Sequence, residues 1–215
     1  MPLENPLSGA EFADQLRVKD VQLTSVWHQQ SSISGGADRL YADRAPSLWR
    51  AEVSIVPLRH AEAEGVMALI NSRGGGLKTI LLYPTRLPFP ASDPRGEIIG
   101  ATLPSINVIS DRLHASFSGF PPGYVIPVGT WFSCVFDSSR YYLGQFAEHR
   151  IAGPAGAVVS VELTPPLPSS ITSGTSITVA KPPGKFRIVP NSAMPLAADL
   201  NFSAIQFSAE QTYSR

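Results

Sequence analysis

Residues 48–83 read LWRAEVSIVPLRHAEAEGVMALINSRGGGLKTILLY and contain three successive patterns of secondary structure. Over residues 48–55, bulky apolar and polar side chains alternate, which is the period of a half-buried strand. Over residues 58–73, apolar side chains recur at helical spacing, after Pro57 and before three consecutive glycines, and these are start and stop signals of a helix. The nearly continuous apolar run at residues 77–83 is typical of a buried strand. The stretch therefore predicts a strand, a helix and a second strand around one core.

Strand patterns continue on both sides of this unit, but no other convincing long helix follows. Residues 18–29 alternate as an amphipathic strand. Beyond Pro84, strand-like runs recur about every 10 to 15 residues with turn residues between them, which is the pattern of a small barrel. We therefore predict a mostly β protein, a β-sandwich or barrel with one α-helix and a small inserted β-barrel.

The composition points to a protein that associates with copies of itself. Charged residues make up 16% of the 215-residue chain, against about 25% in typical domains. Assembly is the simplest way to cover a surface that carries so little charge. The 17 basic and 17 acidic residues cancel, which argues against nucleic-acid binding driven by bulk charge. No apolar run is long enough to span a bilayer, and the first residues do not have the pattern of a secretory signal, so we expect no membrane insertion.

Patterns that carry catalysis, cofactors or metals are not found in the sequence. Glycines precede a Lys-Thr pair at residues 73–79, but a phosphate loop runs from strand to helix, whereas here the order is helix, glycines, strand. The four histidines fall on separate predicted elements, and no serine lies in a Gly-x-Ser-x-Gly turn. Cys134 lies in an apolar run and is predicted to be buried and unreactive. We therefore expect no enzymatic activity, no cofactor and no metal site.

Aromatic side chains offer one alternative, a carbohydrate- or receptor-binding face. Side chains that could line such a face are Trp27, Trp49, Trp131, Tyr141 and Tyr142. All lie in or beside predicted strands, where burial in a core or interface is the ordinary use of aromatic side chains.

Three segments resemble the distal tail proteins of long-tailed phages and of phage-like gene transfer agents. The first is the strand at residues 48–53, which leads into the helix and its glycines. The second is residues 105–109, followed by GFPPGYVIPVGTWF at 119–132. The third is residues 185–189, together with a closing strand at 204–207.

The resemblance implies a virion protein of the phage tail that is made in the bacterial cytoplasm. Residues 1–84 with 188–215 would form a ring-forming domain like that of the tail tube, and 85–187 would form the inserted barrel, which in this family sometimes has the oligonucleotide-binding fold. The protein would form a ring of about six copies. Its partners would be the tail tube protein above and the hub or tip protein below, and DNA would pass through the lumen only in transit. A sugar- or receptor-binding module of the tail tip or baseplate stays the alternative.

Residues 31–46 are the candidate surface for contact between copies. This segment lies between two predicted strands and is longer than the two to five residues of a usual hairpin loop. Arg39, Leu40, Tyr41 and Arg44 combine positive charge with two large apolar groups. The resemblance to tube-like subunits, whose hairpin arms reach onto a neighbour, favours an interface here over a mobile loop. We expect Leu40 and Tyr41 to pack on the adjacent copy, and Arg39 or Arg44 to pair with an acidic group of that copy.

Overall fold

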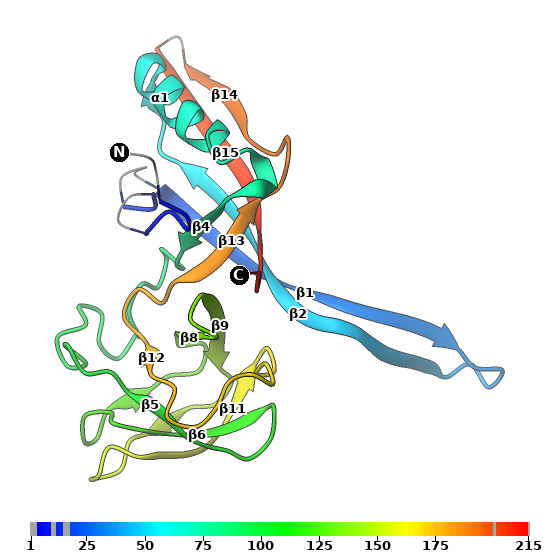
Figure 1. Ribbon diagram of the computed structural model, residues 1–215, viewed down its shortest axis with the longest axis vertical. Coiled ribbons are helices and arrows are strands. Elements are labelled where there is room, and N and C mark those ends of the chain that lie inside the picture. Colours follow the sequence, from blue (N-terminus) through cyan, green and yellow to red (C-terminus); the bar gives the residue numbers. More distant parts are fainter. Residues whose placement is uncertain (1–3, 10–11, 15–17, 200, 215) are drawn as a thin grey trace.

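The computed structural model describes residues 4–9, 12–14, 18–199 and 201–214. Figure 1 shows a large sheet that carries the helix at one end, a small barrel at the other end, and a long hairpin that projects away from both. The predicted fold class, mostly β with a barrel and one helix, is confirmed by the described part of the chain. Within these ranges, no helix has the length and apolar character needed to cross a bilayer.

The large sheet has seven antiparallel strands. Five form the path β1-β2-β15-β13-β4, and β3 and β14 each pair with β15. The strands are β1 (Val18–Ile33), β2 (Arg39–Ile55), β3 (Leu58–Arg59), β4 (Thr79–Leu82), β13 (Gly184–Ile188), β14 (Met194–Asp199) and β15 (Phe202–Gln211). The long closing strand β15 therefore joins the first part of the chain to the last.

Alternation along β2 sorts its side chains between the two faces of the sheet, as the sequence predicts. Trp49, Ala51, Val53 and Ile55 are each at most 5% exposed. Arg50 and Glu52 point to the other face and are exposed. Because successive side chains of a strand point to opposite faces, this one strand defines which side of the sheet holds the core.

Helix α1 (His60–Asn71) packs on β15 with most of the apolar face that its sequence predicts, since Val66, Leu69 and Ile70 all contact the core. Ala61 and Gly65, which the helical spacing places on the apolar face, are exposed. The buried side chains are Ala63 and Ile70, with Val66, Met67 and Leu69 partly buried against the same core. Ala63, Val66, Met67 and Ile70 have the spacing i, i+3, i+4 and i+7 of one helical stripe, so the buried stripe is shifted from the predicted one toward Ala63.

The end of the helix follows the predicted stop. Helix α1 ends at Asn71, and Gly74 adopts a left-handed conformation with φ of 63°. The backbone N–H of Lys78 then donates to the carbonyl of Arg73 across a short 3₁₀ turn, Gly75–Leu77. Glycine tolerates this conformation because it has no Cβ. The glycines thus turn the chain from the helix into β4 and form no phosphate loop.

The barrel is a six-stranded sheet that nearly closes on itself. Its order is β12-β8-β9-β11-β6-β5. The strands are β5 (Ser105–Ile109), β6 (His114–Ser118), β8 (Trp131–Phe136), β9 (Arg140–Phe146), β11 (Val158–Thr164) and β12 (Ile177–Thr178), and β7 (Val125–Ile126) pairs separately with β10 (Arg150–Ile151). A bridge between Ser105 and Ser176 joins the two outer strands. The hydrogen bond from Ile106 N to Thr175 O, at 2.9 Å, supports the same closure.

The sheet and the barrel meet in a packed junction. The indole Nε1 of Trp49 donates to the carbonyl of Leu143 on β9 at 2.8 Å. The Trp49 ring also packs edge-on against Trp131 of β8, with centroids 4.8 Å apart.

The chain returns from the barrel to the large sheet at Gly184, where β13 begins, and residue 188 is the last of that strand. The division into 1–84 with 188–215 and an inserted 85–187 stays a prediction. Removal of residues 85–187 would take most of β13 out of the large sheet.

Candidate assembly surface

The outer half of the β1–β2 hairpin stands away from the rest of the molecule (Figure 1). Strand β15 pairs with β2 only between Arg50 and Ser54. In the described structure, residues 27–46, which we call the arm, are flanked by no third strand. Both edges of this ribbon therefore present unpaired backbone groups, as edge strands do.

The arm is a continuous ribbon, not a long loop. Pairing continues to Ile33 opposite Arg39, so the loop at the tip is only residues 34–38. The tip is closed by hydrogen bonds from Ser34 N to Asp38 O at 2.9 Å and from Ala37 N to Ser34 O at 3.0 Å. Alternation is weak in the sequence of residues 31–46 because neither face of the arm is buried in the chain's own core, so the periodicity that reveals a half-buried strand is missing.

Two irregularities at the base of the arm change its direction. The register shifts between Val26 and His28, and again between His28 and Gln29. Each shift places an extra residue in β2, and bulges of this kind bend a strand and increase its twist. The arm is therefore set at its own angle to the sheet from which it emerges.

The predicted interface residues lie together on the outer part of β2. The side chains of Leu40 and Tyr41 are each 60% exposed, and Arg39 and Arg44 are exposed beside them. Neither arginine forms an ion pair with any residue that the structure describes. The structure therefore brings the four predicted residues together and leaves all of them available to a partner.

Register assigns these side chains to opposite faces of the arm. Tyr41 is paired with Ser31, and Arg39 is paired with Ile33. Directly paired residues share a face, and neighbours along a strand do not. Tyr41 and Ile33 therefore lie on one face, and Leu40 lies on the other. A partner that covers both apolar groups must contact both faces of the ribbon.

The aromatic residues considered for sugar binding do not form one surface. Trp49 and Tyr142 are buried, at 5% and 0% exposed, and Trp131 packs against Trp49. Trp27 is 53% exposed, but it lies on the arm. Stacking a sugar ring requires an exposed aromatic face, which Trp49 and Tyr142 do not offer.

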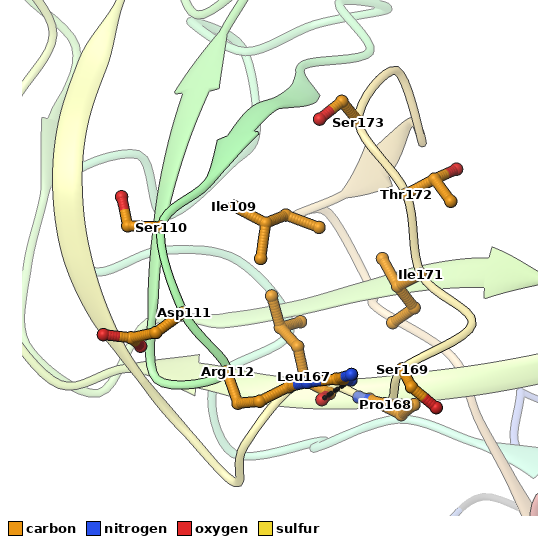
Figure 2. Close-up of a pocket in the computed structure, with 10 residues that line it drawn as sticks. All are labelled: Ile109, Ser110, Asp111, Arg112, Leu167, Pro168, Ser169, Ile171, Thr172 and Ser173. Carbon is orange, nitrogen blue, oxygen red and sulfur yellow. Dashed lines mark hydrogen bonds between the residues drawn. The ribbon is translucent and has the colours of Figure 1, made fainter.

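An open hollow on the barrel lies between the β5–β6 turn and residues 167–173 (Figure 2). It measures about 720 Å³ and has an apolar floor made of Ile109, Leu167 and Ile171, with a polar rim. A hydrogen bond of 3.1 Å from Arg112 Nη1 to the carbonyl of Leu167 joins its two walls. The hollow is open, and its one lining carboxylate, Asp111, is hydrogen-bonded within its own turn.

Asp111 and His114 form an ion pair at the edge of this hollow. The Asp111 Oδ2 and His114 Nδ1 atoms are 2.9 Å apart, and Asp111 Oδ1 accepts the backbone N–H of Leu113 at 2.6 Å. The hydrogen bond to Asp111 raises the pKa of His114, and the hydrogen bond from His114 lowers the pKa of Asp111. The pair therefore stabilises the fold between the ordinary carboxyl pKa and the ordinary imidazole pKa, from about 4 to about 6.5.

We predict that Asp111→Asn lowers the pKa of His114 toward its ordinary value. The favourable contact with charged imidazole is lost in the variant, so the ring releases its proton at lower pH. Titration of the ring proton resonances by NMR measures this directly, with exposed His28 on the arm as an internal reference. An unchanged His114 titration would show that the pair does not form in solution.

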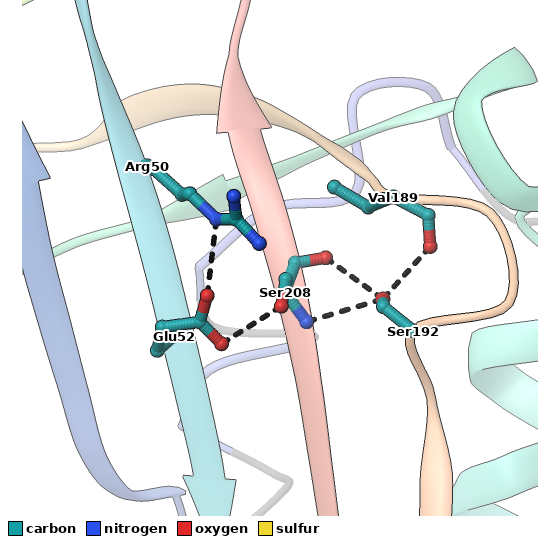
Figure 3. Close-up of polar contacts among 5 residues, drawn as sticks. All are labelled: Arg50, Glu52, Val189, Ser192 and Ser208. Atoms are coloured by element: carbon teal, nitrogen blue, oxygen red, sulfur yellow. Dashed lines mark hydrogen bonds and ion pairs between the residues drawn. The ribbon is translucent and has the colours of Figure 1, made fainter. Parts of the chain in front are cut away.

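The opposite face of the large sheet is polar and internally satisfied (Figure 3). Glu52 accepts from Arg50 Nε at 3.0 Å through one carboxylate oxygen and from Ser208 Oγ at 2.7 Å through the other. The backbone N–H of Ser208 donates to Ser192 Oγ at 3.1 Å. These bonds neutralise Glu52 with Arg50 and join β2 to β15 through Ser208.

Cys134 lies inside the barrel core and is predicted to be inert. Its side chain is 2% exposed, and burial raises the pKa of its thiol to about 12. Thiolate is the reactive form, so a thiol reagent at pH 8 should label the native protein far more slowly than the protein unfolded in urea. Equal labelling rates in the two states would show that the barrel opens readily.

Grouped metal ligands are not found in the part of the chain that is described. No three His, Cys, Asp or Glu residues within it lie together so as to hold an ion. His28 and His149 are exposed on separate elements.

No model of a known protein family matches the chain, and no curated protein matches it in sequence.

Proposed function

We propose that this protein is a structural component of a phage tail that assembles into a ring at the distal end of the tail tube. The ring joins the tube to the hub or baseplate and leaves a lumen for the passage of DNA. Its work is binding, and it carries no catalytic or cofactor chemistry. The proposal combines the sequence resemblance to distal tail proteins with the presence of an exposed arm.

The arm is the observation that carries the proposal. Residues 27–46 hold four large apolar side chains, at positions 27, 33, 40 and 41, that are each at least 53% exposed. A two-stranded ribbon alone is at best marginally stable in water. An extended ribbon with apolar side chains on both faces is stabilised when a partner covers it, and a second copy is the partner that a self-assembling ring supplies.

The size of the arm indicates how it is used. One flat face of the ribbon, about seven residues long and two strands wide, covers roughly 220 Å². A stable interface needs roughly 800 Å² on each partner. The arm therefore supplies only part of the contact between neighbours, both of its faces must contribute, and the bodies of adjacent copies must also touch.

Sedimentation velocity of the purified protein over a range of concentrations tests this function. We expect a discrete species several times heavier than the 23.1 kDa chain. The alternative of a sugar- or receptor-binding module predicts a monomer that binds glycans on an array. A monomer at every concentration tested would overturn the ring proposal.

A further inference from the structure

We propose that the tip of the arm of one copy occupies a groove at the base of the arm of the next copy. The inference rests on the proposed ring and names the surface that receives the arm. It makes each contact head-to-tail, because the donor surface and the receiving surface are different parts of the chain.

The groove lies where the arm, the barrel and the C-terminal segment meet. Its volume is about 490 Å³, and its lining is predominantly apolar. The apolar lining comes from residues that are far apart in the sequence, namely Pro46, Phe136, Pro166, Leu167, Pro168 and Tyr213. The rings of Phe136 and Tyr213 pack edge-on, with centroids 5.7 Å apart, and form a firm wall.

Two arginines at this groove give it positive charge. Arg140 Nη1 pairs with Asp137 at 3.2 Å. Arg112 donates to a backbone carbonyl, but it has no carboxylate partner among the described residues. An apolar floor beside an unneutralised guanidinium suits a segment that carries both a large apolar side chain and a carboxylate.

The outer part of the arm has this combination. Tyr41 and Ile33 share one face near the tip. Asp38 ends the tip loop, and its backbone N–H and carbonyl both bond to Ser34. Its carboxylate forms no hydrogen bond or ion pair with the residues that the structure describes. The complementary charges, Asp38 of one copy and Arg112 of the next, fix the direction of the contact as well as its position.

The length of the arm sets the spacing of neighbouring copies under this proposal. Seven residues separate its base at Trp27 from the tip loop, which spans roughly 23 Å at about 3.3 Å per residue. Pro46 lies both at the base of the arm and in the groove. Neighbouring grooves would thus be about one arm length apart, and a ring of about six copies with that spacing has a radius of roughly 23 Å.

Site-directed disulfide cross-linking tests the contact. One cysteine replaces Gly36 in the tip loop and another replaces Ser169 at the exposed rim of the groove, in the full-length protein with Cys134 left in the barrel core. After mild oxidation, we expect non-reducing electrophoresis to show a ladder of covalent multimers that reducing agent collapses to the monomer. The two positions in one copy are too far apart to cross-link within it.

A matched control pairs Gly36→Cys with Glu64→Cys, which is exposed on α1 and away from the groove, and this pair should give no ladder. If the protein sediments as a ring and the 36–169 pair gives no more cross-linking than the control, the groove is not the receiving surface, although the proposed function stands. If the wild-type protein is a monomer, the proposed function fails together with this inference.

Discussion

The variant that combines Leu40→Thr with Tyr41→Thr is expected to be a folded monomer. Threonine is β-branched and favours strands, so the arm should retain its shape. Burial of one large apolar side chain contributes about 1.5–3 kcal/mol, so each contact loses about 3–6 kcal/mol, and the loss recurs at every contact in the ring. Sedimentation velocity should show a single species of 23.1 kDa, with an unchanged circular dichroism spectrum.

A control on the same ribbon separates a general effect on the arm from loss of the apolar contacts. Gln30→Thr with Ser32→Thr changes two exposed polar residues of the neighbouring strand and should leave the assembly intact. If the Leu40→Thr, Tyr41→Thr variant still forms rings at the protein concentration at which the wild type does, the arm does not hold the copies together. Its exposed apolar residues would then need another explanation.

Phe132→Ala should strongly destabilise the barrel core. The Phe132 ring is fully buried and lies 4.6 Å from the ring of Phe146 and 5.7 Å from that of Phe117, measured between centroids. Removing a buried aromatic ring leaves a cavity and costs about 3–5 kcal/mol. Urea denaturation, followed by near-ultraviolet circular dichroism, measures the loss in unfolding free energy.

The exposed Val135 on the same strand provides the comparison, because Val135→Ala removes apolar volume without opening a cavity. We expect this change to cost under about 1 kcal/mol. A loss below 1 kcal/mol for Phe132→Ala as well would contradict the close packing of the barrel core.

Elements that bury one side in the chain's own core could be predicted from the sequence, because burial imposes a period on the residues. The alternation of residues 48–55 and the stop at Gly74 are of this kind. The face of α1 was harder to predict, because alanines occur all around the helix and their small side chains do not distinguish the buried stripe. Only the contact with β15 shows that Ala63, and not Ala61, is buried.

The assembly surfaces are harder still to predict from the sequence, because they depend on how distant segments are arranged. The mixed charge and large apolar groups of residues 39–44 are visible in the sequence, so these candidate residues could be selected in advance. Their division between two faces depends on the register with β1, which no local pattern specifies. The groove combines Pro46, Arg112, Leu167 and Tyr213, and only the closure of the barrel beside the sheet brings these positions together.

Electron microscopy of the purified wild-type protein tests the central claim most directly. Class averages should show closed rings with a central channel and, at higher resolution, density for each arm lying on the adjacent copy. Isolated particles of single-chain size, or dimers related by a two-fold axis with both arms free, would contradict the account.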